Sequence, residues 1–144
     1  MVLRILTAMY MVGIMDTPQT GDLNVDVRTR EHTELARRLS EQSTVLLKND
    51  RSILPIDATR LRTIAVIGDD ANDNPVFRGE GSGEVSAEYV VTPLEGIKAH
   101  LARRGLSVDV IYVNNSVIAN AVAAAKKADL AIVFAGVESS EGYD

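Results

Sequence analysis

Apolar and polar positions recur along the chain with two different periods, and the period changes repeatedly after residue 30. In residues 30–42, Leu35, Ala36 and Leu39 recur at helical spacing among charged residues, which predicts an amphipathic helix. Residues 63–68 are a continuous run of apolar and β-branched side chains, as expected of a parallel strand covered on both faces. These criteria predict helices at 30–42, 93–104 and 116–128 and strands at 44–47, 63–68, 107–113 and 130–136. Strands and helices that alternate in this way predict βαβ units, a mostly parallel sheet and the α/β fold class.

The helix predicted at 93–104 has signals at both of its ends. Thr92 is suited to the N-cap position, Pro93 to the first helical position, and Glu95 completes a capping box. At the other end, two arginines precede Gly105, which is the order that favours a helix C-terminus.

The N-terminal segment differs from the rest because residues 2–15 are apolar on nearly every side of a possible helix. A helix of that kind belongs inside a larger structure, so we expect residues 1–16 to be the last helix of another domain. A secretory signal is the alternative, but no small-residue cleavage motif follows the apolar stretch. Residues 17–29 contain Pro18, Gly21 and several aspartates, which predicts a linker to a domain at 30–144.

Composition excludes several classes of function. The 144 residues are 46% hydrophobic and 24% charged, as in an ordinary globular domain, and their net charge is −5. With no basic patch, nucleic-acid binding is not expected, and the longest apolar run is too short to cross a membrane. The chain has no cysteine and only two histidines, His32 and His100, which excludes disulfides, cysteine nucleophiles and histidine-rich metal centres.

Candidate chemistry lies after two of the predicted strands, because parallel sheets bind ligands at the carboxyl ends of their strands. In residues 69–85, the glycines have the spacing G-x-G-x-G and no helix follows at once, so a dinucleotide fingerprint is not favoured. We expect either a surface loop or a backbone that approaches a ligand closely, with Ser82 supplying a hydroxyl. Asp69 and Asp70 resemble the acidic pair of receiver domains, but the other residues such a domain needs are missing.

The second candidate segment, residues 137–144, contains Glu138, Glu141 and Asp144. Clustered carboxylates repel one another, so we expect one of them to hold its proton more tightly than usual, which suits a general acid. The alternative is a polar loop that happens to contain acidic residues.

Several short motifs, in the same order along the chain, resemble glycoside hydrolase family 3. They are RIL…GIM at 4–15, HxxLAR at 32–37, QSTVLLKN at 42–49, LPI at 54–56, IAVIG at 64–68, GSGxV at 81–85, TPLEGI at 92–97 and SEGYD at 140–144. The resemblance implies that residues 1–16 end a (β/α)8 barrel and that residues 30–144 begin the α/β-sandwich domain that follows it.

The resemblance also implies an activity and a set of site residues. Family members are retaining β-glycosidases, most often β-glucosidases, so a β-glucoside or an oligosaccharide is the expected substrate, without a metal or organic cofactor. Glu141 matches the acid/base residue, although this chain has Ser-Ser-Glu where many members have Ser-Gly-Glu, and Glu138 is the second choice. Ser82 and Ser140 are the expected substrate-binding residues, and the nucleophilic aspartate belongs to the barrel.

The resemblance has consequences for activity and location, and two alternatives to it remain. The isolated 144 residues are expected to be inactive because they carry only one carboxylate of the catalytic pair. Family members are often secreted or periplasmic, but no convincing signal peptide fixes the location of this one. A stand-alone Rossmann-like or flavodoxin-like binding module would also explain the βαβ pattern, and so would a scaffold that binds sugar without cleaving it.

Overall fold

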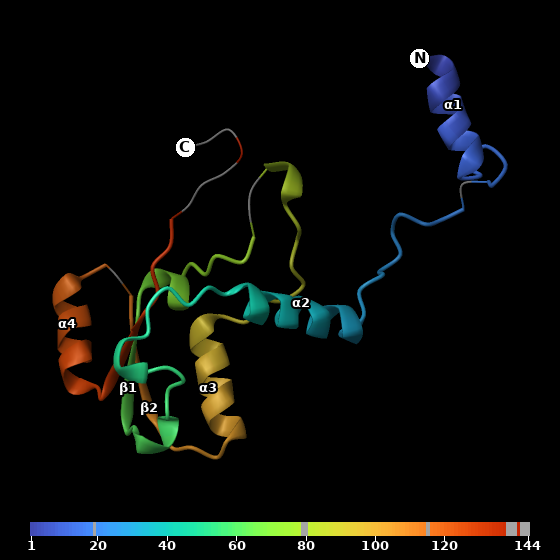
Figure 1. Cartoon of the computed structure of the whole chain (residues 1–144). Coiled ribbons are helices and arrows are strands. Elements are labelled where there is room, and N and C mark those ends of the chain that lie inside the picture. The colour runs from blue at the N-terminus through green and yellow to red at the C-terminus, as the bar shows by residue number, and fades with distance from the viewer. Residues whose placement is uncertain (19, 79–80, 115, 138–140, 142–144) are drawn as a thin grey trace. The chain divides into compact units, whose positions relative to one another are not determined.

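The computed structural model describes residues 1–18, 20–78, 81–114, 116–137 and 141. Its internal contacts divide the chain into two units, residues 1–48 and 49–144. The first unit contains helices α1 and α2, and the second contains a parallel sheet with helices α3 and α4 (Figure 1).

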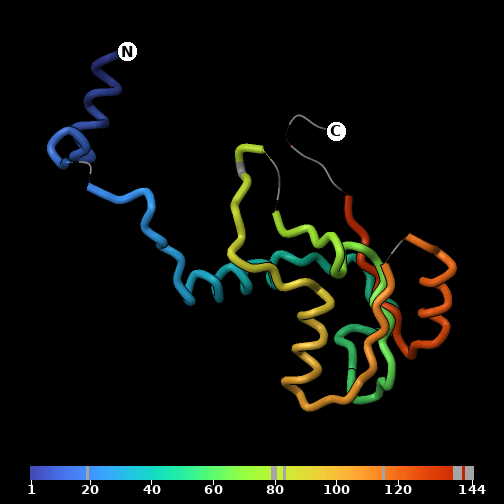
Figure 2. The backbone as a smooth tube through the Cα atoms, turned by 180° about the vertical axis from the view of Figure 1, so that it is seen from behind, coloured from blue at the N-terminus to red at the C-terminus, as the bar shows by residue number. Residues whose placement is uncertain are grey.

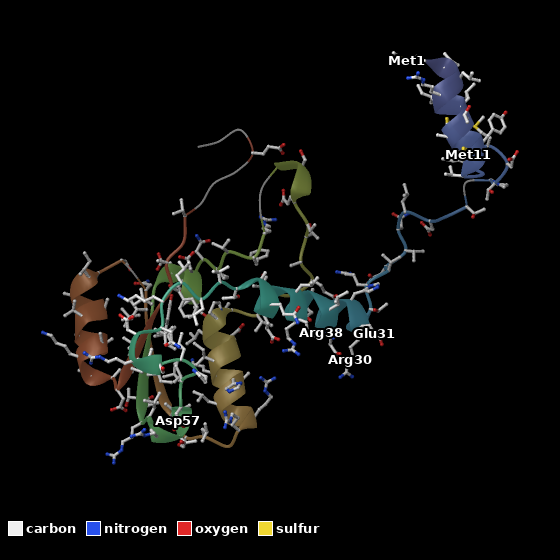
Figure 3. All side chains as sticks on the ribbon, in the orientation of Figure 1. Met1, Met11, Arg30, Glu31, Arg38 and Asp57 are labelled. Atoms are coloured by element: carbon white, nitrogen blue, oxygen red, sulfur yellow. The ribbon has the colours of Figure 1, made fainter. Side chains whose placement is uncertain are left out.

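The N-terminal unit consists of two helices joined by an irregular segment. α1 spans Val2–Met11 and α2 spans Arg30–Ser43, so both helices predicted in this part of the chain are present. α2 begins where the Thr29 hydroxyl accepts a hydrogen bond from the backbone N–H of His32 at 3.2 Å. All residues of both helices are described and none is buried, and charged side chains such as Arg30 and Arg38 project from α2 (Figure 3). No helix in the described ranges is long and apolar enough to span a bilayer.

The strand predicted at 44–47 is wrong, because these described residues form no strand. Thr44, the C-cap of α2, has an extended backbone, but the residues after it pair with no neighbouring strand. Leu47 is 92% exposed. An apolar, β-branched sequence favours extended backbone, but a strand also needs a hydrogen-bonding partner, which a local pattern cannot supply.

The second unit is organised around one three-stranded sheet. β1 spans Thr63–Ile67, β2 spans Asp109–Val113 and β3 spans Leu130–Val133. The order is β2-β1-β3, with both neighbours parallel to the central strand β1, which confirms the predicted α/β class. All three strands therefore end at the same edge of the sheet.

The core lies on both faces of β1, as its uninterrupted apolar sequence predicts. Ile64 and Val66 face α3, Pro93–Arg103, where Leu94 and Leu101 are buried with them. The intervening Ala65 and Ile67 pack instead with Ala124 of α4, which spans Ile118–Lys127. Figure 1 shows α3 and α4 on opposite sides of the sheet. Alternate side chains of one strand thus hold two helices in place.

Two polar side chains fix the backbone of the segment that precedes β1 in the sequence. A single Asp129 carboxylate oxygen accepts hydrogen bonds from the N–H groups of Arg62, at 2.8 Å, and Thr63, at 2.9 Å. These bonds lower the pKa of Asp129 from its ordinary value. The Asn49 side chain bonds the backbone of Leu54 in both directions, donating to its oxygen at 2.9 Å and accepting from its N–H at 3.0 Å. Asn49 therefore shapes the turn that leads to the sheet.

The capping box predicted at the start of α3 is confirmed. The Thr92 hydroxyl accepts from the Glu95 N–H at 3.2 Å, and the Glu95 carboxylate accepts from the Thr92 N–H at 3.0 Å. The helix ends before Gly105, whose φ of +65° is the left-handed conformation of a glycine C-cap.

Replacing Thr92 by alanine is expected to destabilise the first turn of α3 by about 0.5–2 kcal/mol, because one N–H of the helix loses its acceptor. Hydrogen exchange of the amides in that turn measures the effect as faster exchange. Thr92→Ser retains the hydroxyl and serves as the control. Equal exchange in the alanine and serine variants would contradict the role of the cap.

Candidate active site

Two segments that leave the same edge of the sheet form the candidate site. One follows β1 and the other follows β3, and both run from the carboxyl ends of these neighbouring strands (Figures 1 and 2). This is the edge where sequence analysis expects chemistry, since parallel sheets bind ligands outside the carboxyl ends of their strands.

The two segments start in close contact because Gly68 has no side chain. Its φ is +116°, and a Cβ atom built there would lie 2.0 Å from the backbone oxygen of Phe134. The Phe134 N–H donates to the Ile67 oxygen at 2.8 Å, and the Gly68 N–H donates to the Val113 oxygen at 2.9 Å. Gly68 is thus held between the ends of β2 and β3 in a conformation that other residues rarely adopt.

The acidic pair after β1 lies partly inside this junction. Asp69 and Asp70 belong to a 3-10 turn, Asp69–Ala71, and both are half-buried. A Cβ atom on Gly136 would lie 3.0 Å from each carboxylate oxygen of Asp70. The Asp70 side chain therefore packs against the backbone of the segment that follows β3.

Hydrogen bonds between polar side chains join the segment after β1 to the end of β2 and to the start of α3. Asp73 accepts hydrogen bonds from Asn72 at 3.0 Å and from Asn114, just after β2, at 3.3 Å. Hydrogen bonding, led by Asn72, lowers the pKa of Asp73. The Thr92 hydroxyl lies 3.3 Å from the Asn72 side-chain oxygen, twenty positions earlier in the sequence. The described residues contain no group of three or more histidines, aspartates and glutamates able to hold a metal ion.

Ser82 and Glu141, two of the predicted site residues, lie in direct contact. One oxygen of the Glu141 carboxylate, Oε2, accepts from the Ser82 N–H at 2.9 Å and from the Ser82 hydroxyl at 2.7 Å. The two residues are 59 positions apart in the sequence, and the glycine turn Gly81–Gly83 carries the serine. Ser140 and Glu138, the other predicted site residues, lie outside the described residues.

The glycine before Ser82 leaves room for this contact. Gly81 has a φ of +83°, and a Cβ atom there would lie 2.7 Å from both the Cβ and Oε2 of Glu141. A side chain at position 81 would therefore push Glu141 away from Ser82. The backbone of this segment thus lies close to Glu141, while its expected approach to a ligand stays a prediction.

The hydrogen bonds from Ser82 affect the pKa of Glu141. The N–H of Ser82 and then its hydroxyl stabilise the carboxylate, so the pKa of Glu141 is lowered from its ordinary value. Glu141 is therefore not the carboxyl of this segment that holds its proton more tightly than usual, and for the other two carboxyls the expectation stays a prediction. Its physical basis was repulsion from Glu138 and Asp144, which lie outside the described residues.

An ion pair that the sequence patterns did not indicate joins the two sides of the glycine turn. The Arg78 guanidinium forms an ion pair with the Glu84 carboxylate, and its Cζ atom lies 5.5 Å from the centre of the Phe77 ring. The available signal was the opposite charge of two residues that flank the glycines, six positions apart.

The sequence of the chain is similar to a known protein family and to curated proteins. Residues 44–144 match the family described as Glycosyl hydrolase family 3 C-terminal domain. Among curated proteins, the chain is 36% identical to "Probable beta-glucosidase L" of Emericella nidulans, with 99% of this chain and 22% of that protein covered. It is 31% identical to a "Beta-xylosidase" of Formosa agariphila, with 92% and 20% covered.

Solved structures give the same picture. The β-glucosidase D2-BGL from Chaetomella raphigera superposes with a TM-score of 0.76 at 28% identity, covering 96% of this chain and 22% of that one. The family 3 β-glucosidase of Bifidobacterium adolescentis superposes with a TM-score of 0.62 at 34% identity, covering 88% and 19%. The chain thus spans about a fifth of the length of the curated relatives it matches, 22% and 20% in the two cases above.

Proposed function

The chain belongs to glycoside hydrolase family 3, and we propose that it supplies the acid/base residue, Glu141, of a retaining β-glycosidase, most specifically a β-glucosidase. The observation that carries this proposal is the contact between Glu141 and Ser82 at the carboxyl edge of the sheet. The nucleophilic aspartate would come from a barrel domain of the same polypeptide, since the relatives are far longer than this chain.

Two properties of Glu141 support its role. A retaining glycosidase needs two carboxyl groups about 5–5.5 Å apart, so the acid/base must lie on a segment that a second domain can face. Glu141 is exposed, and Ser82 contacts only one of its two oxygens in the bonds described above. Oε1 would therefore be the oxygen that carries the proton toward the sugar.

The proposed reaction proceeds in two steps. The barrel aspartate attacks the anomeric carbon, a C–O bond to the enzyme forms, and the glycosidic C–O bond breaks as Glu141 gives its proton to the departing oxygen. Glu141, now a carboxylate, then takes a proton from a water molecule whose oxygen attacks the same carbon and releases the aspartate. The sugar leaves with its original configuration, and Glu141 is protonated again.

The lowered pKa of Glu141 is compatible with this cycle. The second step needs the carboxylate, which the two hydrogen bonds from Ser82 stabilise. The first step needs the acid, and a negatively charged aspartate facing Glu141 would raise its pKa, because two like charges in one site disfavour double ionisation. We infer that the barrel aspartate supplies this repulsion.

Substrate binding is proposed for Ser82 and Ser140. The Ser82 hydroxyl donates its hydrogen to Glu141, which leaves its lone pairs available to accept a bond from a sugar hydroxyl. Ser140 is assigned by its position next to Glu141 in the sequence.

Replacing Ser82 by alanine is expected to shift the alkaline limb of the kcat/KM profile to higher pH. The variant loses the hydroxyl bond that favours the Glu141 carboxylate, so the pKa of Glu141 rises and the acid form persists to higher pH. The pH dependence of hydrolysis of an aryl β-glucoside by the full-length polypeptide measures this shift. An alkaline limb that stays in place or moves to lower pH would contradict the proposed proton donor.

The 144-residue chain on its own is expected to hydrolyse an aryl β-glucoside no faster than buffer does. It carries the proposed acid/base but not the proposed nucleophile, and both are needed for the double displacement. The assay is direct, with the full-length polypeptide as the positive control. Sustained turnover by the isolated chain would mean that the nucleophile lies within these residues.

A further inference from the structure

The glycine turn that carries Ser82 is flanked by two oppositely charged side chains. Arg78 precedes it and Glu84 follows it, and the two form an ion pair with both side chains 45% exposed. The Arg78 guanidinium also lies over the ring of Phe77, at 5.5 Å from its centre. Arg78 is thus held on two sides, by a carboxylate and by an aromatic ring.

A continuous series of contacts leads from this ion pair to Glu141. The N–H of Glu84 donates to the Gly81 oxygen at 3.1 Å, so Glu84 contacts Arg78 through its side chain and the turn through its backbone. Within the turn, Ser82 donates both its N–H and its hydroxyl to Oε2 of Glu141.

We infer that the Arg78–Glu84 ion pair closes the base of the glycine turn and holds Ser82 against Glu141, which makes Arg78 and Glu84 positioning residues for the acid/base. The inference rests on the proposed function of Glu141. Glycine has the largest backbone freedom of any residue, and positions 79, 81 and 83 are all glycine. A segment of that composition needs a restraint at its base if Ser82 is to occupy one place.

Acid catalysis requires a precisely positioned proton donor, so loss of this restraint is expected to lower the rate of reaction. A displacement of about 1 Å in a catalytic group can lower a rate by about a hundredfold. An exposed ion pair contributes at most about 1 kcal/mol to stability, so its loss leaves the domain folded. The consequence should therefore be found in proton transfer rather than in folding.

Two substrates with different leaving groups distinguish a displaced general acid from a general loss of activity. The anion of a strongly acidic phenol, such as 2,4-dinitrophenol, departs without being protonated, whereas an alkoxide needs the proton of the acid. The value of kcat/KM reports the first step only. A displaced Glu141 therefore lowers kcat/KM for an alkyl β-glucoside and leaves the value for the dinitrophenyl β-glucoside nearly unchanged.

The experiment uses the full-length polypeptide with Arg78→Glu, Glu84→Arg and the charge-reversed double variant. Each single variant is expected to lower kcat/KM for the alkyl β-glucoside by about tenfold, with less than about twofold change for the dinitrophenyl β-glucoside. The double variant restores most of the loss because the pair forms again with its charges exchanged. Arg30→Glu and Glu34→Arg on α2 reverse an exposed pair of the same residue types at 3.1 Å and are the matched control.

Three results would overturn the inference: an equal loss on both substrates, no loss on either, or a double variant no better than the single ones. Glu141→Gln, measured in parallel, tests the proposed function separately. If Glu141→Gln shows the selective loss and the Arg78 and Glu84 variants do not, the positioning role alone is wrong. If Glu141→Gln hydrolyses the alkyl β-glucoside normally, Glu141 is not the acid and the proposed function is wrong as well.

Discussion

Replacing Glu141 by alanine in the full-length polypeptide is expected to lower kcat for an aryl β-glucoside by about 10²–10⁴-fold, the usual contribution of a general acid/base. Added azide is expected to restore part of the turnover, because it attacks the glycosyl-enzyme without giving up a proton. The product of that reaction is a glucosyl azide of retained configuration, which chromatography separates from glucose. Rescue together with this product identifies Glu141 as the base of the second step.

Two further variants make the assignment specific. Glu34→Gln removes an exposed carboxylate on α2 and should leave kcat unchanged. Glu138→Ala tests the second-choice residue of the same segment. Loss and azide rescue at Glu138 with normal turnover at Glu141 would transfer the acid/base role to Glu138, and full activity in both variants would leave the segment without a catalytic role.

Replacing Gly68 by alanine is expected to destabilise the C-terminal unit by about 3–5 kcal/mol, a large part of the total stability of an ordinary domain. A backbone φ of +116° is strained for alanine, and the new Cβ would lie 2.0 Å from the backbone oxygen of Phe134. Because the obstacle is backbone, the ends of β1 and β3 must separate. Thermal unfolding and the soluble yield of the polypeptide measure the loss.

Gly96→Ala is the matched control for Gly68→Ala. Gly96 lies inside α3, and a Cβ atom there meets nothing within 4 Å, so alanine is expected to stabilise the helix by about 0.5–1 kcal/mol. Opposite effects of the same substitution would show that the conformation and the neighbours of each glycine decide the outcome. Equal unfolding temperatures for both variants would contradict the strain assigned to Gly68.

The elements that sequence analysis predicted well are those that local chemistry determines. The start of α3 follows from Thr92 and Glu95, whose side chains accept hydrogen bonds from N–H groups of the first turn, and from Pro93, which has no N–H that needs an acceptor. β1 was predicted because a run of apolar β-branched residues suits a strand covered on both faces, and α3 and α4 do cover it. The strand predicted around Leu47 has the same kind of sequence, but no neighbouring strand pairs with these described residues.

The site could be predicted as two separate residues but not as a contact. Ser82 and Glu141 were each singled out from their own segments, while the bonds between them depend on β1 and β3 being neighbours in the sheet. The requirement for glycine at position 68 likewise arises from Phe134, a residue far away in the sequence. Such interactions depend on tertiary structure, so they cannot be predicted from a pattern of neighbouring residues in the sequence.

The hydrogen bond between Asn72 and Thr92 joins two residues twenty positions apart, near the two ends of the loop that runs from β1 to α3. Because this hydrogen bond joins the ends of the loop, the interior of the loop can change in length or sequence while the strands and α3 keep their places. Lengthening a closed loop carries only a small entropic penalty. Changes within residues 73–91 are therefore expected to alter the segment that bears Ser82 without displacing β1 or α3.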